Sequence, residues 1–309
     1  MNSLAYFKAL ADSTRIRIYH VLLDHELSVN ELVSLLGTGQ SRVSHHVKIL
    51  ADAGLLACRR SGVWAFYSAE KGQDLALFNE AVRDMFRKET DLLDDLAHAE
   101  QIIADRSVVT RQFFNTIAPR WDDLKKEILG SFDINRAISL DLSPVTVAVD
   151  LGCGTGELMG FLLEKARHVI GVDSSQKMLD EARKRFVDAN GAADLRLGEL
   201  EHLPMKDGEA DLAVISLALH HLSKPEDAVR EAFRILKPGG RLVVAEFAQH
   251  ADETLRKHYG DRWLGLSKEE VTDWLAGCGF ALEGVTPHSL LRSLVLHIYI
   301  AEKPLFHTL

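Results

Sequence analysis

The stretch that decides the fold runs from Val145 to Glu157 and reads Val-Thr-Val-Ala-Val-Asp-Leu-Gly-Cys-Gly-Thr-Gly-Glu. Four of its first five residues are apolar and three of those four are valines, so we predict a buried strand that ends at Asp150. The glycines that follow are Gly152, Gly154 and Gly156. We expect them to form a turn with almost no side chains, followed by a helix over residues 157–165. A strand, a glycine turn and a helix N-terminus place bare backbone N–H groups against a ligand, which predicts a nucleotide-type site.

The residues downstream strengthen this interpretation. The glycine spacing G-x-G-x-G differs from the dinucleotide fingerprint G-x-G-x-x-G, and alone it is weak evidence. However, a second apolar run, Val169–Val172, ends in Asp173, which lies 21 residues after Gly152. In a second parallel strand this position aims a carboxylate at ribose hydroxyls. Ser174 begins the next expected helix, in which Met178 is a candidate for the wall beside an adenine.

Five motifs in order resemble those of a class I S-adenosylmethionine-dependent methyltransferase domain, from about Phe113 to the C-terminus. They are Asp150–Gly156, Val172-Asp173, Gly198-Glu199-Leu200, Asp211–Ser216 and Leu236-Lys237-Pro238-Gly239-Gly240. The resemblance implies an α/β doubly wound, Rossmann-like sheet with its ligand at the C-terminal strand edge. It also implies S-adenosylmethionine or S-adenosylhomocysteine as the cofactor.

The same resemblance implies which residues bind the adenosyl ligand. They are Asp150, Gly152, Gly154, Gly156, Asp173, Ser174, Met178, Glu199, Leu200 and Ser216. In that family the acid at Asp150 would bind the ligand's ammonium group, directly or through water. Asp173 would accept hydrogen bonds from both ribose hydroxyls, and Glu199 would accept one from the adenine amino group. The glycines would let the backbone approach the methionyl carboxylate. Residues 113–115 and 118–122 would close over the methionyl end.

The sequence says less about catalysis. Methyl transfer needs an aligned acceptor and sometimes a general base. His220 and His221 follow the expected fourth strand, where such a base could sit, but we assign no catalytic residue. No acceptor signature is present, and Cys153 alone does not supply the several cysteines that arsenic methylation would need.

Residues 1–70 have the pattern of an α+β winged helix-turn-helix domain. Ser28-Val29-Asn30-Glu31 fits a capping box that begins a helix. The next expected helix, residues 40–51, places Val43, Val47 and Leu50 on its core face. Two short strands, 55–59 and 63–68, would then flank a basic tip, Arg60-Ser61-Gly62.

The order of these elements and their amino-acid sequences resemble the ArsR-type winged-helix repressors. The matching segments are Leu10–Arg15, Val43–His46 and Gly54–Leu56. The DNA-binding residues that we predict are Gln40, Ser41, Arg42, Ser44, His45, Lys48, Arg59 and Arg60. These polar, short or cationic side chains suit base edges and phosphates, whereas His46 is expected near the core.

The cysteines give no sign of a metal site. Metal-sensing members of that family carry cysteines in the stretch that here reads Glu26-Leu27-Ser28-Val29-Asn30, so soft-metal sensing is not expected there. The three cysteines, Cys58, Cys153 and Cys278, are scattered without a C-x-x-C spacing. We therefore expect neither a disulfide framework nor a bound metal.

Residues 71–112 are expected to form a helical connector between the winged helix and the ligand domain, residues 113–309. Apolar residues recur there at helical intervals between many charged ones, and no proline interrupts them. The simple interpretation is a surface helix broken once, and the alternative is a pair of helices that form a dimer seam. Because ArsR-type proteins dimerise through a helix after the wing, we expect a homodimer on a pseudo-palindromic operator in double-stranded DNA, with half-sites about 34 Å apart.

Charge and composition fit a globular protein with a ligand-binding C-terminal part. The net charge is −9, and residues 1–70 hold seven Lys/Arg against six Asp/Glu, which leaves 29 against 39 for the remainder. An acidic ligand domain suits a cationic sulfonium better than a phosphate-rich ligand. The N-terminus has no basic-then-apolar signal and no apolar run approaches about 20 residues. We expect a cytoplasmic protein with no membrane partner.

Two functions remain open. In the first, the protein is a transcriptional regulator whose methyltransferase-like domain senses S-adenosylhomocysteine or S-adenosylmethionine, a layout that resembles the S-adenosylhomocysteine-responsive repressors. In the second, it is an active small-molecule methyltransferase with an autoregulatory DNA-binding domain. The ligand motifs cannot separate them, since both need the same pocket. The complete polar face of the 40–51 helix and the missing acceptor signature favour the regulator.

Overall fold

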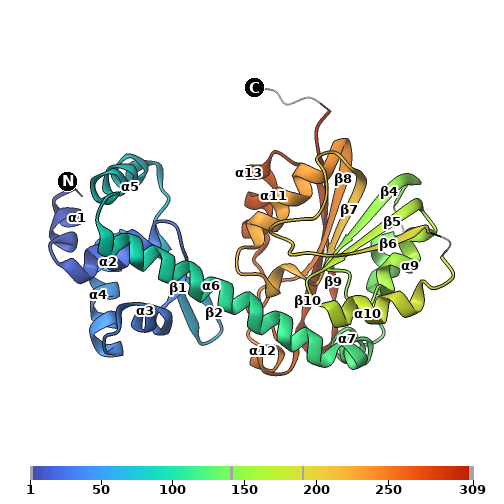
Figure 1. Ribbon diagram of the computed structural model, residues 1–309, viewed down its shortest axis with the longest axis horizontal. Coiled ribbons are helices and arrows are strands. Elements are labelled where there is room, and N and C mark those ends of the chain that lie inside the picture. Colours follow the sequence, from blue (N-terminus) through green and yellow to red (C-terminus); the bar gives the residue numbers. More distant parts are fainter. Residues whose placement is uncertain (1–2, 140–141, 190, 306–309) are drawn as a thin grey trace. The chain divides into compact units, whose positions relative to one another are not determined.

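The computed structural model describes residues 3–139, 142–189 and 191–305. The chain divides into two compact units, Met1–Arg106 and Ser107–Leu309. Figure 1 shows the elements of each unit in chain order. The connector that we expected at residues 71–112 is divided between them, with 71–106 in the first unit and 107–112 in the second.

The first unit is built on four short helices. They are α1 (Ser3–Leu10), α2 (Ser13–Leu22), α3 (Val29–Leu36) and α4 (Gln40–Asp52). The capping box is confirmed, because the Ser28 hydroxyl accepts the Glu31 N–H and the Glu31 carboxylate accepts the Ser28 N–H at 2.8 Å. Val43, Val47 and Leu50 of α4 are buried, as their spacing predicted. The helix-turn-helix is thus stabilised by the packing of the apolar side chains that recur along α3 and α4.

The hairpin differs from our expectation at its tip. Among the described residues, β1 (Leu27–Ser28), β2 (Leu56–Ser61) and β3 (Trp64–Ala69) form an antiparallel sheet in the order β1-β3-β2. Ser61 pairs with Trp64, so Gly62 and Val63 make the turn and Arg60 lies within β2. Gly62 has φ 57°, the left-handed conformation that two-residue hairpin turns favour. The expected tip Arg60-Ser61-Gly62 was therefore wrong by one residue or more.

Two helices follow the hairpin, α5 (Gln73–Phe86) and α6 (Thr90–Ile117). The break between them bears out a helical segment interrupted once. In the first unit Asp95 of α6 accepts two hydrogen bonds from Arg17, each of 2.7 Å. Arg106 near the end of that unit donates to both oxygens of Glu31, at 2.7 and 2.6 Å. The remaining residues of α6 belong to the second unit.

The second unit has a mostly parallel sheet whose order, for the described residues, is β6-β5-β4-β7-β8-β10-β9. The strands are β4 (Val145–Leu151), β5 (Ala166–Asp173), β6 (Ala193–Leu197), β7 (Ala210–Ser216), β8 (Leu236–Phe247), β9 (Ala281–Ser289) and β10 (Val295–Glu302). Only the β10 pairings, with β8 and β9, are antiparallel among these strands. The strand order reverses at β4, which has β5 on one side and β7 on the other. Ligands of doubly wound sheets bind at such a switch point.

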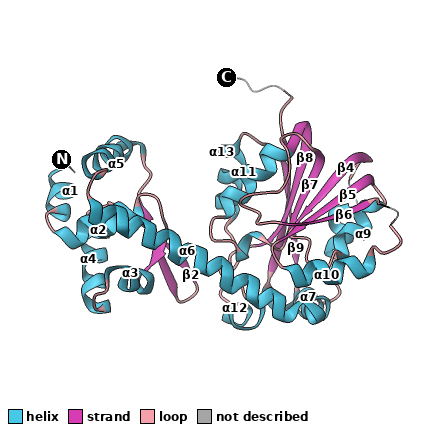
Figure 2. Ribbon diagram, viewed as in Figure 1, coloured by secondary structure: helices cyan, strands magenta, loops and turns pink. Residues whose placement is uncertain are grey.

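Helices cover both faces of this sheet, as Figure 2 shows. They are α7 (Trp121–Leu129), α8 (Ile134–Ser139), α9 (Glu157–Leu163), α10 (Gln176–Arg185), α11 (Pro225–Ile235), α12 (Glu253–Tyr259) and α13 (Lys268–Cys278). Short 3-10 segments occur at Ala118–Arg120, Leu219–His221 and Leu291–Ser293. Apolar residues such as Ala148, Val149 and the run Val169–Val172 form the buried centre of the sheet. The doubly wound fold predicted from the sequence is confirmed.

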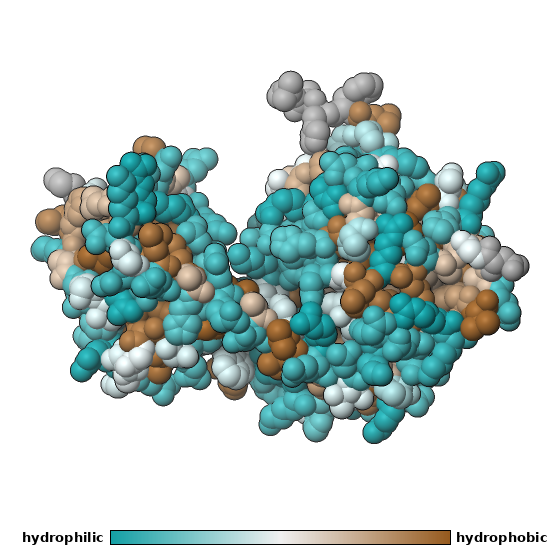
Figure 3. Space-filling view, viewed as in Figure 1, coloured by the Kyte–Doolittle hydropathy of each residue, from teal (hydrophilic) through white to brown (hydrophobic). Residues whose placement is uncertain are grey.

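The surface is polar with scattered apolar groups. On the face drawn in Figure 3, hydrophilic side chains predominate and hydrophobic ones lie between them. In the first unit, the exposed large apolar side chains include Leu4, Phe7, Leu77 and Met85. No helix within residues 3–139, 142–189 and 191–305 has both the length and the apolar character of a membrane span.

Candidate functional site

The turn after β4 requires glycine at three positions because of its backbone conformation. Gly152, Gly154 and Gly156 have φ of 81°, 52° and 78°, a region that residues with a Cβ rarely adopt. Their N–H groups donate to Val172 O, to the Asp173 carboxylate and to Cys153 O, at 2.8, 2.9 and 2.8 Å. The expectation of bare N–H groups at these glycines was therefore wrong. All three shape the turn, and the N–H groups of Gly152 and Gly154 bond it to β5.

A pocket opens at this turn, at the switch point of the sheet. Of the ten residues predicted to bind the ligand, nine line it: Asp150, Gly152, Gly154, Asp173, Ser174, Met178, Glu199, Leu200 and Ser216. Gly156 is not among the lining residues. A Cβ on Gly156 would come within 2.7 Å of the Phe186 ring, so this glycine is required by packing against the residue that follows α10.

Asp150 is a buried carboxylate with an unused oxygen. Its side chain is in β4 and the residue is only 2% exposed. Within the described part of the chain, its Oδ2 has no hydrogen-bond partner. Burial raises the pKa of Asp150 to about 7, against the opposing charge of Lys125. An ammonium group in the pocket would supply both the missing hydrogen bond and the missing charge.

Asp173, at the end of β5, is held by the backbone around it. Its two oxygens accept the Gly154 N–H at 2.9 Å and the Ser175 N–H at 2.7 Å. Burial raises the pKa of Asp173 to about 6, although both N–H bonds act in the opposite direction. Each oxygen keeps acceptor capacity, so the carboxylate is pre-oriented for two ligand hydroxyls.

Glu199 has a cationic partner that the sequence did not reveal. Arg111 of α6 donates to Glu199 Oε1 at 2.7 Å. The two side chains are 38% and 39% exposed, so this ion pair is open to exchange with a ligand or with water. The partners lie 88 residues apart in sequence, and no local pattern links them.

Aromatic side chains wall the pocket, as the segments 113–115 and 118–122 led us to expect. Phe114 and Trp121 line it, with ring centroids 5.4 Å apart. Phe114 also stands edge-on to His221, at 4.7 Å. The segment is tied to the body of the unit because Asn115 accepts from Ser175 Oγ at 2.8 Å and Thr155 donates to Asp122 at 2.6 Å. Phe113 instead packs beside Gly260.

The two histidines after β7 differ in charge. Burial lowers the pKa of His220, but Glu246 and Asp261 more than offset this and raise it to about 10. Burial together with the charge of His220 lowers the pKa of His221 to about 3. Of the two, His221 lines the pocket, and its Nδ1 lies 3.1 Å from Gly260 O. A neutral imidazole therefore faces the ligand space.

The predicted DNA-binding side chains of α4 share one exposed face. Gln40, Ser41, Arg42, Ser44, His45 and Lys48 are all exposed, opposite the buried positions of the helix. His46 is largely buried, with its side chain 12% exposed, as predicted. The residue that precedes the helix, Gly39, has no side chain to cap it, and its carbonyl oxygen accepts the N–H groups of Arg42 and Val43 at 3.0 and 3.2 Å.

The two hairpin arginines point to opposite faces, because they are neighbours in β2. Arg60 is exposed. Arg59 makes two hydrogen bonds with the Glu26 carboxylate, of 2.6 and 3.0 Å. A DNA contact by Arg59 would have to compete with this ion pair, whereas Arg60 faces solvent.

Family models match both units. A bacterial regulatory protein model of the arsR family matches residues 12–57, and a methyltransferase-domain model matches residues 149–244. The first match contains all of α4, and the second contains the end of β4, the glycine turn and β5 to β7. Both resemblances found in the sequence are thus confirmed, as are the S-adenosylmethionine-dependent class of the second unit and the DNA-binding class of the first.

Curated relatives cover different parts of the chain. An uncharacterized 37.1 kDa protein in transposon TN4556 of Streptomyces fradiae is 42% identical over 111 residues, which are 35% of this chain and 32% of that protein. The ubiquinone/menaquinone biosynthesis C-methyltransferase UbiE of Azotobacter vinelandii is 30% identical over 219 residues, or 60% of this chain and 86% of the enzyme. The corresponding enzyme of Ruegeria sp. is covered over 62% of its length.

Among solved structures, the [4+2]-cyclase SpnF matches the fold with a TM-score of 0.54 and 19% identity. The match covers 63% of this chain and 95% of SpnF. At this identity the likeness concerns the fold alone. The same fold carries a cyclase activity there, so it does not by itself establish methyl transfer.

Proposed function

The chain belongs to the S-adenosylmethionine-dependent methyltransferases and carries an arsR-family DNA-binding domain, and from this premise we propose that it is a transcriptional regulator whose methyltransferase domain binds S-adenosylhomocysteine or S-adenosylmethionine as an effector. One observation carries the proposal. One chain carries both the polar face of α4, which is exposed within the first unit, and an acid-lined pocket in the second unit. A role on bacterial DNA also assigns the protein to the cytoplasm.

The chemistry of the pocket supports an adenosyl ligand with a cationic end. Asp150 Oδ2 is unpartnered among the described residues, and Asp173 is pre-oriented for hydroxyls. Glu199 and the buried Met178 line the same space, where an adenine ring would need an acceptor and an apolar wall. When bound, S-adenosylmethionine supplies an electrophilic methyl group, and S-adenosylhomocysteine has none to give.

One helix supports a coupling between ligand and DNA binding. In the first unit, Arg106 of α6 holds Glu31, the capping-box residue of α3. In the second unit, Thr110 and Phe114 of the same helix line the pocket. A ligand that repositions the C-terminal part of α6 therefore acts on an element that is bonded to the helix-turn-helix. A full shift between DNA-bound and released populations takes about 5.5 kcal/mol of differential affinity.

Exposed apolar side chains on α1 and α5 support a homodimer. Leu4 and Phe7 are 60% and 61% exposed, and Leu77 is 80% exposed. The ring of Phe7 lies 5.9 Å from that of Phe78 in α5, so these residues lie on neighbouring helices of one unit. A second copy that buries them would present two α4 helices to successive major grooves of a pseudo-palindromic operator.

The second candidate function is an active methyltransferase with an autoregulatory DNA-binding domain. The observation that favours it is the similarity to UbiE enzymes, which extends over 86% of the Azotobacter vinelandii protein. His221 lies on the pocket wall, but its pKa, lowered to about 3, makes it a weak general base for a small-molecule acceptor. The acceptor has no recognised binding residues, so the regulator remains our first proposal.

An electrophoretic DNA-shift assay tests the proposal. The full-length protein is titrated onto its upstream DNA without ligand, with S-adenosylhomocysteine and with S-adenosylmethionine. At least one ligand should change the affinity for DNA by about 5-fold or more. The Asp173→Ala variant should bind DNA but lose the response, because the ribose-binding carboxylate is gone. A shift that neither ligand alters would refute the effector role and leave the enzyme as the better candidate.

A further inference from the structure

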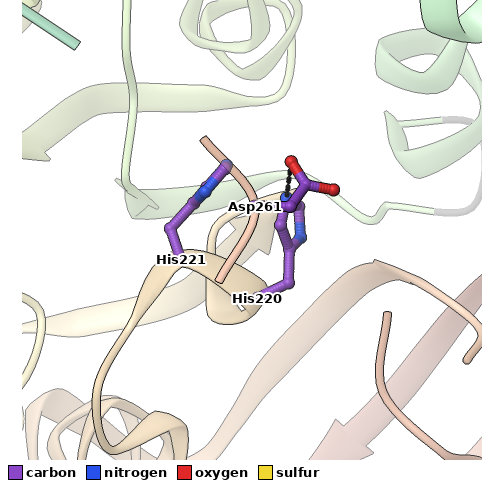
Figure 4. Close-up of side chains that lie close together, drawn as sticks. All are labelled: His220, His221 and Asp261. Carbon is purple, nitrogen blue, oxygen red and sulfur yellow. Dashed lines mark ion pairs between the residues drawn. The ribbon is translucent and has the colours of Figure 1, made fainter. Parts of the chain in front are cut away.

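A buried cluster of His220, His221 and Asp261 lies at the pocket, and the proposed regulator assigns no role to it. Figure 4 shows the two histidines on the turn after β7 and Asp261 on a separate segment that follows α12. The three residues are 2%, 7% and 4% exposed. One nitrogen or oxygen atom of each lies within 4.8 Å of the others.

Asp261 is the residue whose surroundings are incomplete. Its Oδ1 lies 3.6 Å from His220 Nε2, which is longer than an N–H···O hydrogen bond. Its Oδ2 is buried and has no hydrogen-bond partner in the part of the chain that the structure describes. A buried carboxylate in this condition calls for a cation close to it, and in the metal-free protein the protonated His220 ring is that cation, at a distance too long for a hydrogen bond.

The opposite side of each histidine ring is already bonded. His220 Nδ1 lies 2.6 Å from Glu246 Oε1, and Glu246 is fixed in turn by the Phe247 N–H at 2.7 Å. His221 Nδ1 lies 3.1 Å from the carbonyl oxygen of Gly260. A metal ion would displace the Nε2 proton of His220, and with each Nδ1–H donating to these oxygens each Nε2 would then present a lone pair to the ion. Metal-binding histidines are oriented in this way, by a carboxylate or a backbone carbonyl behind the ring.

We propose that His220, His221 and Asp261 bind one divalent transition-metal ion, and that Zn²⁺ fits this donor set best. Two imidazoles and one carboxylate are the ligands of three-residue zinc sites that keep a fourth position open. Ligand atoms about 2.1 Å from a tetrahedral ion are roughly 3.4 Å apart, close to the separation of His220 Nε2 and Asp261 Oδ1. Imidazole ligands disfavour Mg²⁺ and Ca²⁺.

The ion would lie in the wall of the ligand pocket, because His221 belongs to both. Its open position is then available to a water molecule or to a polar group of a pocket ligand. The nearby His250 is not part of the set, since its Nδ1 accepts the Asp252 N–H at 3.2 Å and the proton is left on Nε2. The metal site goes beyond the proposed regulator and does not depend on it.

Metal titration of the full-length protein tests the site directly. After treatment with a chelator, the protein should take up one Zn²⁺ per chain in competition with a chromophoric chelator. Co²⁺ in its place should give the intense visible absorption of a four- or five-coordinate site. Asp261→Asn, which keeps the shape but removes the charge, should weaken Zn²⁺ binding by at least about 100-fold. Neither readout uses DNA or an adenosyl ligand, so failure here leaves the regulator proposal untouched.

A control and a second variant make the test decisive. His168→Gln removes a histidine of β5 outside the cluster and should bind Zn²⁺ like the parent. Glu246→Gln should weaken Zn²⁺ binding by about 10- to 100-fold, because it removes the carboxylate that orients His220. This variant replaces Asp261→Asn in the test if circular dichroism shows that Asp261→Asn is unfolded. Absence of stoichiometric Zn²⁺ in the parent, or equal affinity in the parent and in a folded cluster variant, would overturn the proposal.

Discussion

At the scale of single residues, the pocket is defined by carboxylates that are costly to leave charged. Asp150 and Asp173 have raised pKa values, of about 7 and about 6, and burial is the first cause for both. A protein does not gain stability by burying two charged acids near one another without partners. Such residues instead mark a site where a ligand supplies the missing donors.

Asp150 should make the stability of the ligand-free protein depend on pH. Because its pKa is raised to about 7 in the folded state from 3.8, the folded form binds the proton more tightly. Its contribution is therefore fully favourable below about pH 4 and is lost as the pH rises through 7. Asp150→Asn should raise the melting temperature at pH 8 by the equivalent of a few kcal/mol and have little effect at pH 4. Calorimetry at both pH values checks this, and equal shifts at the two would contradict it.

Sequence reasoning found most of the pocket because its residues lie in local motifs. The glycine turn, Asp173 and Glu199 each follow a strand at a recognisable spacing. The pairing of Arg111 with Glu199 and the closeness of Asp261 to His220 were missed, since the partners are 88 and 41 residues apart and only the fold brings them together. The N–H groups of the glycines were misjudged because a sequence does not reveal which acceptors the fold brings to them, here two backbone carbonyls and the Asp173 carboxylate.

At the scale of elements, α4 and the hairpin carry the DNA-binding surface. The periodicity of α4 predicted its exposed face, since the buried positions Val43, Val47 and Leu50 fix the opposite side. The hairpin turn was less predictable. Arg60-Ser61-Gly62 and Ser61-Gly62-Val63-Trp64 both place a glycine in the bend, and the cross-strand pairing of Ser61 with Trp64 decides between them.

Arg60 should contribute more to DNA binding than Arg59, because Arg60 is exposed and Arg59 is paired with Glu26. Arg60→Ala should weaken binding to all DNA sequences and reduce the slope of log affinity against log salt by about 1. Fluorescence anisotropy over a series of salt concentrations measures both. Arg183→Ala, at an exposed helical arginine of the second unit, is the matched control. An unchanged slope for Arg60→Ala would remove the hairpin from the interface.

Helix α6 should transmit the response to ligand. Arg106→Ala breaks the two hydrogen bonds to Glu31 and should destabilise the first unit by roughly 1.5–3 kcal/mol. The pocket is not part of that contact, so calorimetry should find the affinity for S-adenosylhomocysteine unchanged in the absence of DNA. The ligand-dependent change in DNA binding should be reduced. A variant that responds to ligand like the parent would show that this contact is not in the coupling path.

At the scale of the whole molecule, regulation requires a linkage between two binding equilibria on one chain. The fold class of each unit could be read from sequence patterns, but a linkage is a free energy and no motif encodes it. If ligand changes the affinity for DNA, then DNA must change the affinity for ligand by the same factor. An enzyme whose DNA-binding domain is merely attached would not show this reciprocity.

The most direct measurement is therefore the affinity of the full-length protein for S-adenosylhomocysteine by titration calorimetry, with and without saturating operator DNA. We expect the two dissociation constants to differ by about 5-fold or more, and by the same factor that the ligand imposes on DNA binding. Identical dissociation constants with and without DNA would contradict the regulator and leave two independent activities on one chain.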